Sequence, residues 1–238
     1  MTRCDDRIDR DDAPRRLTRR AALLGLPLLL AGCTATTRFE TIHLSTDIRR
    51  AFRAGDVAAD WDRIYAGGFD GGFEIEPLDF SQIDDQYLRH WVWYDGREAP
   101  GTIVVDPEDR FLYLVQEGGR AIRYGVGVGR EGFGWSGRAT VGRKSVWPTW
   151  TPPREMTLRD AEAAKWAGGM PGGPENPLGA RALYLFQGSR DTLYRIHGNN
   201  DPSSIGTAVS SGCIRMLNQD VIDLHRRVPI GTPVIVLG

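Results

Sequence analysis

The chain has 238 residues, of which 41% are hydrophobic and 26% charged, so it can form one well-packed domain with an extension, or two small domains. The charged fraction is ordinary for a folded protein and argues against a largely disordered chain. The formal net charge is -1, and no block of Lys and Arg lies beyond the N-terminus. This argues against nucleic acid as the main partner, because phosphate binding needs a concentrated basic face.

Residues 1–32 have the pattern of an export signal. Arg19 and Arg20 precede an apolar run of eleven residues, 21–31, which is too short to span a bilayer, since that takes about 20 residues. The arginine pair resembles a twin-arginine signal, and LAGC resembles a lipoprotein processing box in which Cys33 receives the lipid. Cleavage after the small residues of CTATT is the alternative. We therefore expect an exported protein on the periplasmic face, anchored in a membrane through Cys33, or soluble in the periplasm if Cys33 is not lipidated.

Two segments precede the predicted main domain. Residues 33–60 read as a tether or linker that grades into a short helical stretch. Residues 61–99 read as an N-terminal extension that packs on the main domain. This extension is first rich in glycine and then aromatic, and its stretch DDQYLRHWVWYDG predicts a short helix or strand.

From residue 100 to residue 238, short strand patterns alternate with turns. RFLYLVQ and RAIRYGVGV flank an EGG turn and predict a hairpin. Further strands are expected over residues 101–106, 181–186, 192–198 and 232–237. Two short helices are expected, over residues 157–166 with Thr157 as N-cap and over residues 218–228 with Asn218 as cap. These elements predict a mostly β domain, a sandwich or an open barrel.

Two glycine patterns resemble nucleotide-binding motifs but lack their context. GVGREG, residues 127–132, matches G-x-G-x-x-G, yet the residues after it show no helical periodicity that could place a phosphate on a helix N-terminus. GRATVGRKS nearly matches a P-loop, but Arg143 stands at the lysine position and no helix follows. We expect these glycines to permit turns and close backbone approach instead.

Cys213 is the one thiol expected in the mature domain, because Cys4 lies in the signal and Cys33 is the predicted lipid site. A disulfide within the domain is therefore excluded. A metal site is not indicated either, because the four histidines show no i, i+4 spacing and no second cysteine is near. Two interpretations stay open: an inert packing cysteine and a nucleophile.

Residues near Cys213 favour the nucleophile. His197 ends a predicted strand sixteen residues earlier, and the turn-rich loop between them can return the chain beside that strand. If CIRM is extended, Cys213 and Arg215 share one face while Ile214 points to the core. The backbone N–H groups of Gly212 and Cys213 are candidate oxyanion donors. Asp201 and the Gly198 carbonyl are equal candidates for orienting the imidazole.

The segment YRIHGNNDPSSIGTAVSSGCIRMLNQDVIDL resembles the signature of the L,D-transpeptidase catalytic domain of the YkuD or ErfK type. In that family His-Gly is followed, after about fifteen residues, by Ser-X-Gly-Cys-Ile/Val-Arg. The resemblance continues upstream through VGRKSVWPTWTPPREM and PGTIVVDPEDRFLYLV. It implies a mostly β fold and a cysteine acyltransferase that acts on peptidoglycan stem peptides.

The resemblance also implies site roles. Cys213 would be the nucleophile that expels D-alanine, and His197 would be the base. Neither a metal nor an organic cofactor would be required. The other implied roles are orientation of the imidazole by the Gly198 carbonyl, oxyanion binding at Gly212 and Cys213, and substrate contacts at Arg215, Ser211, Tyr184 and Tyr194.

The chain departs from the family pattern at Ser211, where many members carry histidine. A second imidazole there would not be essential in an active enzyme. The acceptor stays open among a diaminopimelate amine, an amine of an outer-membrane protein or lipoprotein, a D-amino acid and water. The alternative functions are an L,D-carboxypeptidase or hydrolase with the same acyl-enzyme, and a non-catalytic peptidoglycan-binding module. A sortase-like enzyme is disfavoured because its histidine lies much farther upstream.

Overall fold

One nine-stranded sheet organises the chain, in the strand order β12-β10-β9-β8-β13-β4-β5-β6-β3. The computed structural model describes residues 60–79, 81, 83–129, 135–210 and 212–238. These residues all belong to one compact unit, residues 42–238. The strands of the sheet are β3 (His90–Trp93), β4 (Ile103–Asp106), β5 (Phe111–Gln116), β6 (Arg120–Gly125), β8 (Gly137–Val146), β9 (Arg181–Gln187), β10 (Arg190–His197), β12 (Ile214–Arg215) and β13 (Pro233–Val236). The mostly β prediction is confirmed.

The remaining elements are short. Two small sheets pair β1 (Gly68–Asp70) with β2 (Phe73–Ile75), and β7 (Val128–Gly129) with β11 (Ala208–Ser210). The helices are α2 (Trp61–Ile64), α3 (Arg154–Arg159), α4 (Ala161–Lys165) and α5 (Asn218–Arg227), with 3-10 turns η2 (Asp85–Tyr87) and η3 (Pro202–Ser204). None of the helices in the described ranges is long and apolar enough to cross a membrane. The predicted signal and Cys33 lie outside the described residues.

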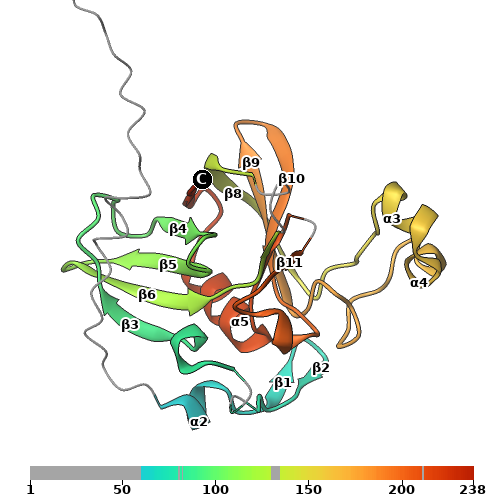
Figure 1. The fold of residues 1–238 in the computed structure, drawn as a ribbon, viewed down its shortest axis with the longest axis horizontal. Coiled ribbons are helices and arrows are strands. Elements are labelled where there is room, and N and C mark those ends of the chain that lie inside the picture. Colours follow the sequence, from blue (N-terminus) through green and yellow to red (C-terminus); the bar gives the residue numbers. More distant parts are fainter. Residues whose placement is uncertain (1–59, 80, 82, 130–134, 211) are drawn as a thin grey trace, which may run out of the picture. The chain divides into compact units, whose positions relative to one another are not determined.

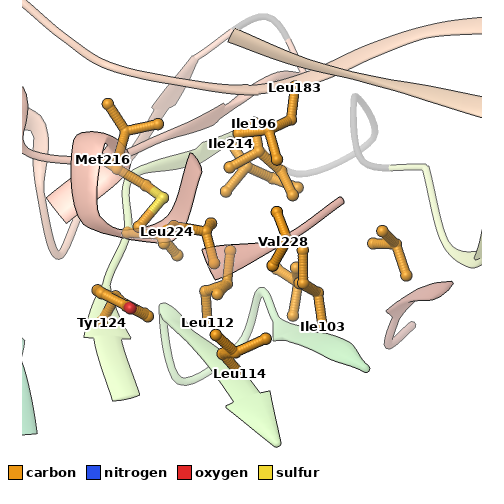
Figure 2. Close-up of a cluster of buried hydrophobic side chains, with 14 of the residues drawn as sticks. Ile103, Leu112, Leu114, Tyr124, Leu183, Ile196, Ile214, Met216, Leu224 and Val228 are labelled. Carbon is orange, nitrogen blue, oxygen red and sulfur yellow. The ribbon is translucent and has the colours of Figure 1, made fainter. Parts of the chain in front are cut away.

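Helix α5 fills the space between the two halves of the sheet. Figure 1 shows strands β3 to β6 on one side of α5 and strands β8 to β10 on the other. In Figure 2 the side chains of Leu224 on α5 and of Val228, which directly follows α5, lie between Ile196 and Ile214 on one side and Leu112 and Leu114 on the other. All of these side chains are buried. The core therefore holds β10 and β12, which carry the candidate site, against the rest of the sheet.

The hairpin of β5 and β6 forms with the expected strands. The aromatic stretch of the predicted extension forms both η2 and β3, and β3 pairs with β6 as the last strand of the sheet. Residues 61–99 therefore contribute a strand to the sheet in addition to packing on it.

Two helix predictions need correction. The predicted helix 157–166 is two helices, because Asp160 is extended and its carboxylate caps α4 through the backbone N–H groups of Glu162 and Ala163. Thr157 lies inside α3, which starts after Pro153. Asn218 does not cap α5, because Leu217 takes the N-cap position and the Asn218 side chain accepts hydrogen bonds from other segments.

Buried ion pairs attach residues 61–99 to the main domain. Arg181 donates to both carboxylate oxygens of Asp70, at 2.7 and 2.8 Å. Arg89 lies 3.3 Å from Asp220 and 2.6 Å from Asp223, both on α5. Because loss of one partner of a buried pair leaves an uncompensated charge, removal of Arg89 or Arg181 is expected to weaken the packing of the N-terminal elements on the domain.

Candidate active site

Strands β10 and β12 run parallel and bring the two halves of the predicted site together. Ile196 is aligned with Ile214, and His197 with Arg215. The two isoleucines lie in the core. Because side chains alternate along a strand, Arg195 and His197 lie on the opposite face, together with Cys213 and Arg215. The prediction that Ile214 lies in the core is confirmed, and the same alternation puts Cys213 and Arg215 on the other face.

Cys213 is half-buried and is the free cysteine in the part of the chain that the structure describes. Withdrawal of the thiol from water raises its pKa, while a hydrogen bond from the Arg195 backbone and the charges of Arg195 and Arg215 oppose the rise. The thiol is therefore protonated at rest, and it must give up its proton as it attacks.

His197 is buried, and its Nδ1 lies 2.6 Å from the carbonyl oxygen of Gly198. A carbonyl can only accept, so Nδ1 carries the hydrogen and Nε2 keeps the lone pair. Burial, together with the charges of Arg215 and Arg195, lowers the pKa of His197 to about 4, although the hydrogen bond to the Gly198 carbonyl opposes the shift. The imidazole is therefore neutral near neutral pH and can accept a proton at Nε2.

The peptide group that orients His197 is itself held by Asn218. Its carbonyl belongs to Gly198, and its N–H, that of Asn199, donates to Asn218 Oδ1 at 3.3 Å. The same oxygen accepts the Ala180 N–H at 2.9 Å. A Cβ on Gly198 would lie 2.4 Å from Asn218 Oδ1, so glycine is needed for this approach. Asn218 was not predicted as a site residue, and no local pattern indicates this contact.

Of the two candidates for orienting the imidazole, the structure selects the Gly198 carbonyl. The Asp201 carboxylate instead accepts from the backbone N–H and the hydroxyl of Ser203, within η3.

Glycines on either side of β12 allow the backbone to approach closely. Gly212 has a φ of 125°, a conformation that favours glycine. Gly127, from the first glycine motif, pairs with Arg215 through two backbone hydrogen bonds of 2.9 and 2.8 Å. A Cβ on Gly127 would lie 2.4 Å from the Ser204 carbonyl oxygen. The expectation that this glycine permits close backbone approach is confirmed.

The two predicted tyrosines lie on different faces. Tyr184 on β9 is aligned with Arg195, and both Arg195 and Arg143 stack on its ring. Tyr194 packs against the core and lies 5.7 Å from the Trp135 ring. It shares the face of Ile196, which corrects the prediction that Tyr194 lines the site. Ser211 lies outside the described residues.

A cavity of about 590 Å³ borders the loop that follows His197. Its described lining contains no lysine or arginine, and neither Cys213 nor His197 contributes to it. Five carboxylates line it, those of Glu74, Glu76, Asp79, Glu175 and Asp201. The cavity is thus next to the loop but separate from the thiol. Within the described ranges, no group of His, Cys, Asp or Glu is arranged to hold a metal ion.

Fold and site together define a mostly β domain with a thiol and a neutral imidazole on one face of its sheet. The chain belongs to the L,D-transpeptidase catalytic domain family, YkuD, whose model matches residues 100–236.

Two Escherichia coli K12 proteins are among its relatives. "Probable L,D-transpeptidase YbiS" is 35% identical over 139 residues, which cover 56% of this chain and 43% of that protein. "Probable L,D-transpeptidase ErfK/SrfK" is 35% identical over 145 residues, which cover 58% and 44%. The matched part therefore spans less than half the length of these curated relatives.

A solved structure from Brucella melitensis, titled as a probable carnitine operon oxidoreductase, is 49% identical and covers 67% of this chain and 99% of that chain. Its TM-score is 0.46. A solved L,D-transpeptidase 3 from Mycobacterium tuberculosis is 19% identical, with a TM-score of 0.41, and covers 58% and 60%. Family membership rests on the family model over residues 100–236 and not on these two structures.

Proposed function

We propose that the protein is a peptidoglycan L,D-transpeptidase in which Cys213 is the nucleophile. The thiol sulfur attacks the carbonyl at the L-centre of diaminopimelate in a donor tetrapeptide. His197 Nε2 takes the thiol proton and returns it to the leaving amine, so the C–N bond breaks and D-alanine departs. The thioester then passes to an acceptor amine, which regenerates the thiol.

The observation that carries this proposal is the neutral, oriented imidazole on the same face as a protonated thiol. The Gly198 carbonyl holds the tautomer that leaves Nε2 free of hydrogen. Burial keeps both groups neutral, so the proton moves during the attack and not before it. Arg215 is proposed to contact the substrate, and the N–H groups of Gly212 and Cys213 to bind the oxyanion.

Covalent labelling tests the nucleophile. Incubation of the purified protein with a carbapenem should give a stoichiometric adduct in the intact mass, and Cys213→Ala should give none. A folded wild-type protein that forms no adduct would show a non-catalytic binding module and would refute the enzyme.

Product analysis identifies the acceptor. With purified tetrapeptide muropeptides, a diaminopimelate acceptor gives dimers, water gives tripeptides, and an added D-amino acid gives exchange products. Attachment of an outer-membrane protein or lipoprotein requires that protein in the assay and gives a peptide-modified lysine or N-terminus. A product set with released D-alanine and tripeptide alone would identify a carboxypeptidase and contradict the transpeptidase.

We propose further that the chain is exported and anchored through a lipid on Cys33, at the periplasmic face. The support is the twin-arginine-like pair followed by LAGC. Cys33→Ala should move the protein from the membrane fraction to the soluble fraction. If wild type and variant are both soluble, the protein is not lipidated at Cys33.

A further inference from the structure

A row of side chains crosses the sheet from β8 to the thiol. Arg143 on β8 is aligned with Tyr184 on β9, and Tyr184 with Arg195 on β10. The register of β10 and β12 continues the row to Cys213, which precedes Ile214 just as Arg195 precedes Ile196. The row therefore forms a continuous strip on the face that carries the candidate site.

Within this strip the Tyr184 ring holds two guanidinium groups. Cζ of Arg143 lies 3.6 Å from the ring centroid, and Cζ of Arg195 lies 4.5 Å from it. The ring itself is buried, so its position is fixed by the sheet. A guanidinium that stacks through its flat face keeps its N–H groups, which point outward in its plane, for other partners.

The two guanidinium groups differ in what they already bind. The Arg195 fork is taken by Asp191, with N–O distances of 2.9 and 3.1 Å. Arg143 is exposed, and no hydrogen bond or ion pair joins its guanidinium to another of the described residues. The Arg195–Asp191 pair has no net charge. The positive charge and the N–H donors of the Arg143 guanidinium, in contrast, can bind a ligand. A planar fork of N–H donors fits a carboxylate with two hydrogen bonds.

Distance along the row indicates which carboxylate fits. Tyr184 lies two strands away from Cys213, and strands are spaced about 4.8 Å apart, so the guanidinium over its ring is roughly 10 Å from the thiol. An extended peptide advances about 3.3 Å per residue, so this distance is two or three residues. The carboxylate of the leaving D-alanine lies next to the reacting bond and is too close. A second carboxylate farther along the donor peptide fits.

We propose that Arg143, held on Tyr184, binds a second carboxylate of the donor stem peptide, remote from the carbonyl that Cys213 attacks. This inference rests on the proposed function. It makes Arg143 a specificity-determining residue that favours stem peptides with a free carboxylate over amidated ones.

The test compares two donor tetrapeptides, one with its remote carboxylates free and one with them amidated. Acylation of Cys213 by each donor is followed by intact mass for wild type, Arg143→Gln and Arg143→Lys. Arg138→Gln is the matched control, since Arg138 is an exposed arginine on the same strand. Transfer from the preformed thioester to an acceptor amine is measured separately.

For wild type we expect kcat/KM to fall about 10- to 100-fold on amidation, since hydrogen bonds between charged groups have about this value. Arg143→Gln should show that loss with the carboxylate donor, mainly in KM, and no further loss on amidation. The kcat/KM of Arg143→Lys with the carboxylate donor should lie between those of wild type and Arg143→Gln. Arg138→Gln should have the same kcat/KM as wild type with both donors.

Three results would overturn the inference. Arg143→Gln could match wild type, it could lose the same factor with both donors, or it could slow only the transfer to the acceptor. A wild-type protein that neither donor acylates, although the thiol reacts with iodoacetamide, would refute the proposed function and this inference with it.

Discussion

The two faces of strands β10 and β12 differ in chemistry although they are built from the same few residues. Ile196 and Ile214 point to the core and are 0% and 5% exposed. Arg195, His197 and Cys213 point the other way, where they meet charges and backbone groups. One face gives the site its rigidity and the other its reactivity. Changes on the two faces should therefore separate stability from catalysis.

The largest effect is expected from His197→Gln, on the reactive face. Loss of the base should slow acylation of Cys213 by the donor peptide about 10²- to 10⁴-fold, the usual range for general-base catalysis. Rates of adduct formation, followed by intact mass, measure this effect. Circular dichroism should show an unchanged fold. A loss under tenfold in a folded variant would mean that His197 is not the base.

On the core face, Ile196→Ala should lower the free energy of unfolding by about 2–5 kcal/mol, because it leaves a cavity in a fully buried cluster. Ile196→Val is the matched control, with an expected loss of about 0.5–1.5 kcal/mol. Urea titration measures both. Under conditions where the variants are folded, acylation should stay within a few-fold of wild type. A loss of rate comparable to that of His197→Gln would show that the two faces are not separable.

The buried imidazole also predicts a pH dependence of stability. In the unfolded chain His197 binds a proton near its ordinary pKa of 6.5, whereas in the folded protein it does so near 4. Between these values the unfolded state binds more protons, so the free energy of unfolding decreases as the pH falls. The contribution of His197 to this free energy is complete above pH 6.5 and is lost as the pH falls toward 4. In total, the lowered pKa of His197 is expected to reduce the free energy of unfolding by about 3 kcal/mol at low pH.

Other groups titrate in the same range, so the measurement must be a difference. Burial raises the pKa of Asp220 to about 7, which stabilises the fold as the pH falls and opposes the effect of His197. Burial lowers the pKa of His225 to about 4, which acts in the same direction as His197. Both groups are present in His197→Gln. Unfolding titrations from pH 7 to pH 4.5 should therefore show a steeper loss for wild type than for the variant, and equal slopes would contradict the lowered pKa.

The sequence was most informative where one local rule was enough. Alternation along CIRM placed Ile214 in the core, as the structure shows, and Cys213 and Arg215 on the opposite face. The same rule applied to YRIHG pairs Arg195 with His197 and Tyr194 with Ile196. This rule would have identified Arg195 as a residue on the face of the candidate site and would have excluded Tyr194 from that face. The sequence therefore contained the information needed for both assignments.

Contacts that depend on strand order could not be predicted. Arg143 approaches Tyr184 because β8 lies beside β9. Asn218 reaches the loop after His197 because α5, between the two halves of the sheet, packs against β9. Residues 41 and 19 positions apart meet in these contacts, and no local pattern indicates them. The break of the predicted helix at Asp160 has a different cause, since a side-chain cap there competes with continued helix.

The smallest effect is expected from Asn218→Leu. This substitution tests whether Asn218 helps to position His197 on the reactive face. The substitution removes the acceptor of two backbone N–H groups, those of Ala180 and Asn199, and frees the peptide whose carbonyl orients His197. We expect kcat for acylation to fall about tenfold with little change in KM, together with a loss of about 1–3 kcal/mol in stability. Asn218→Asp should restore the rate, since a carboxylate still accepts both hydrogen bonds. Its charge also suits the first position of α5, where the helix dipole favours an anion. If Asn218→Asp fails to restore kcat although it restores stability, the contact supports only the fold and the imidazole is oriented by Gly198 without it.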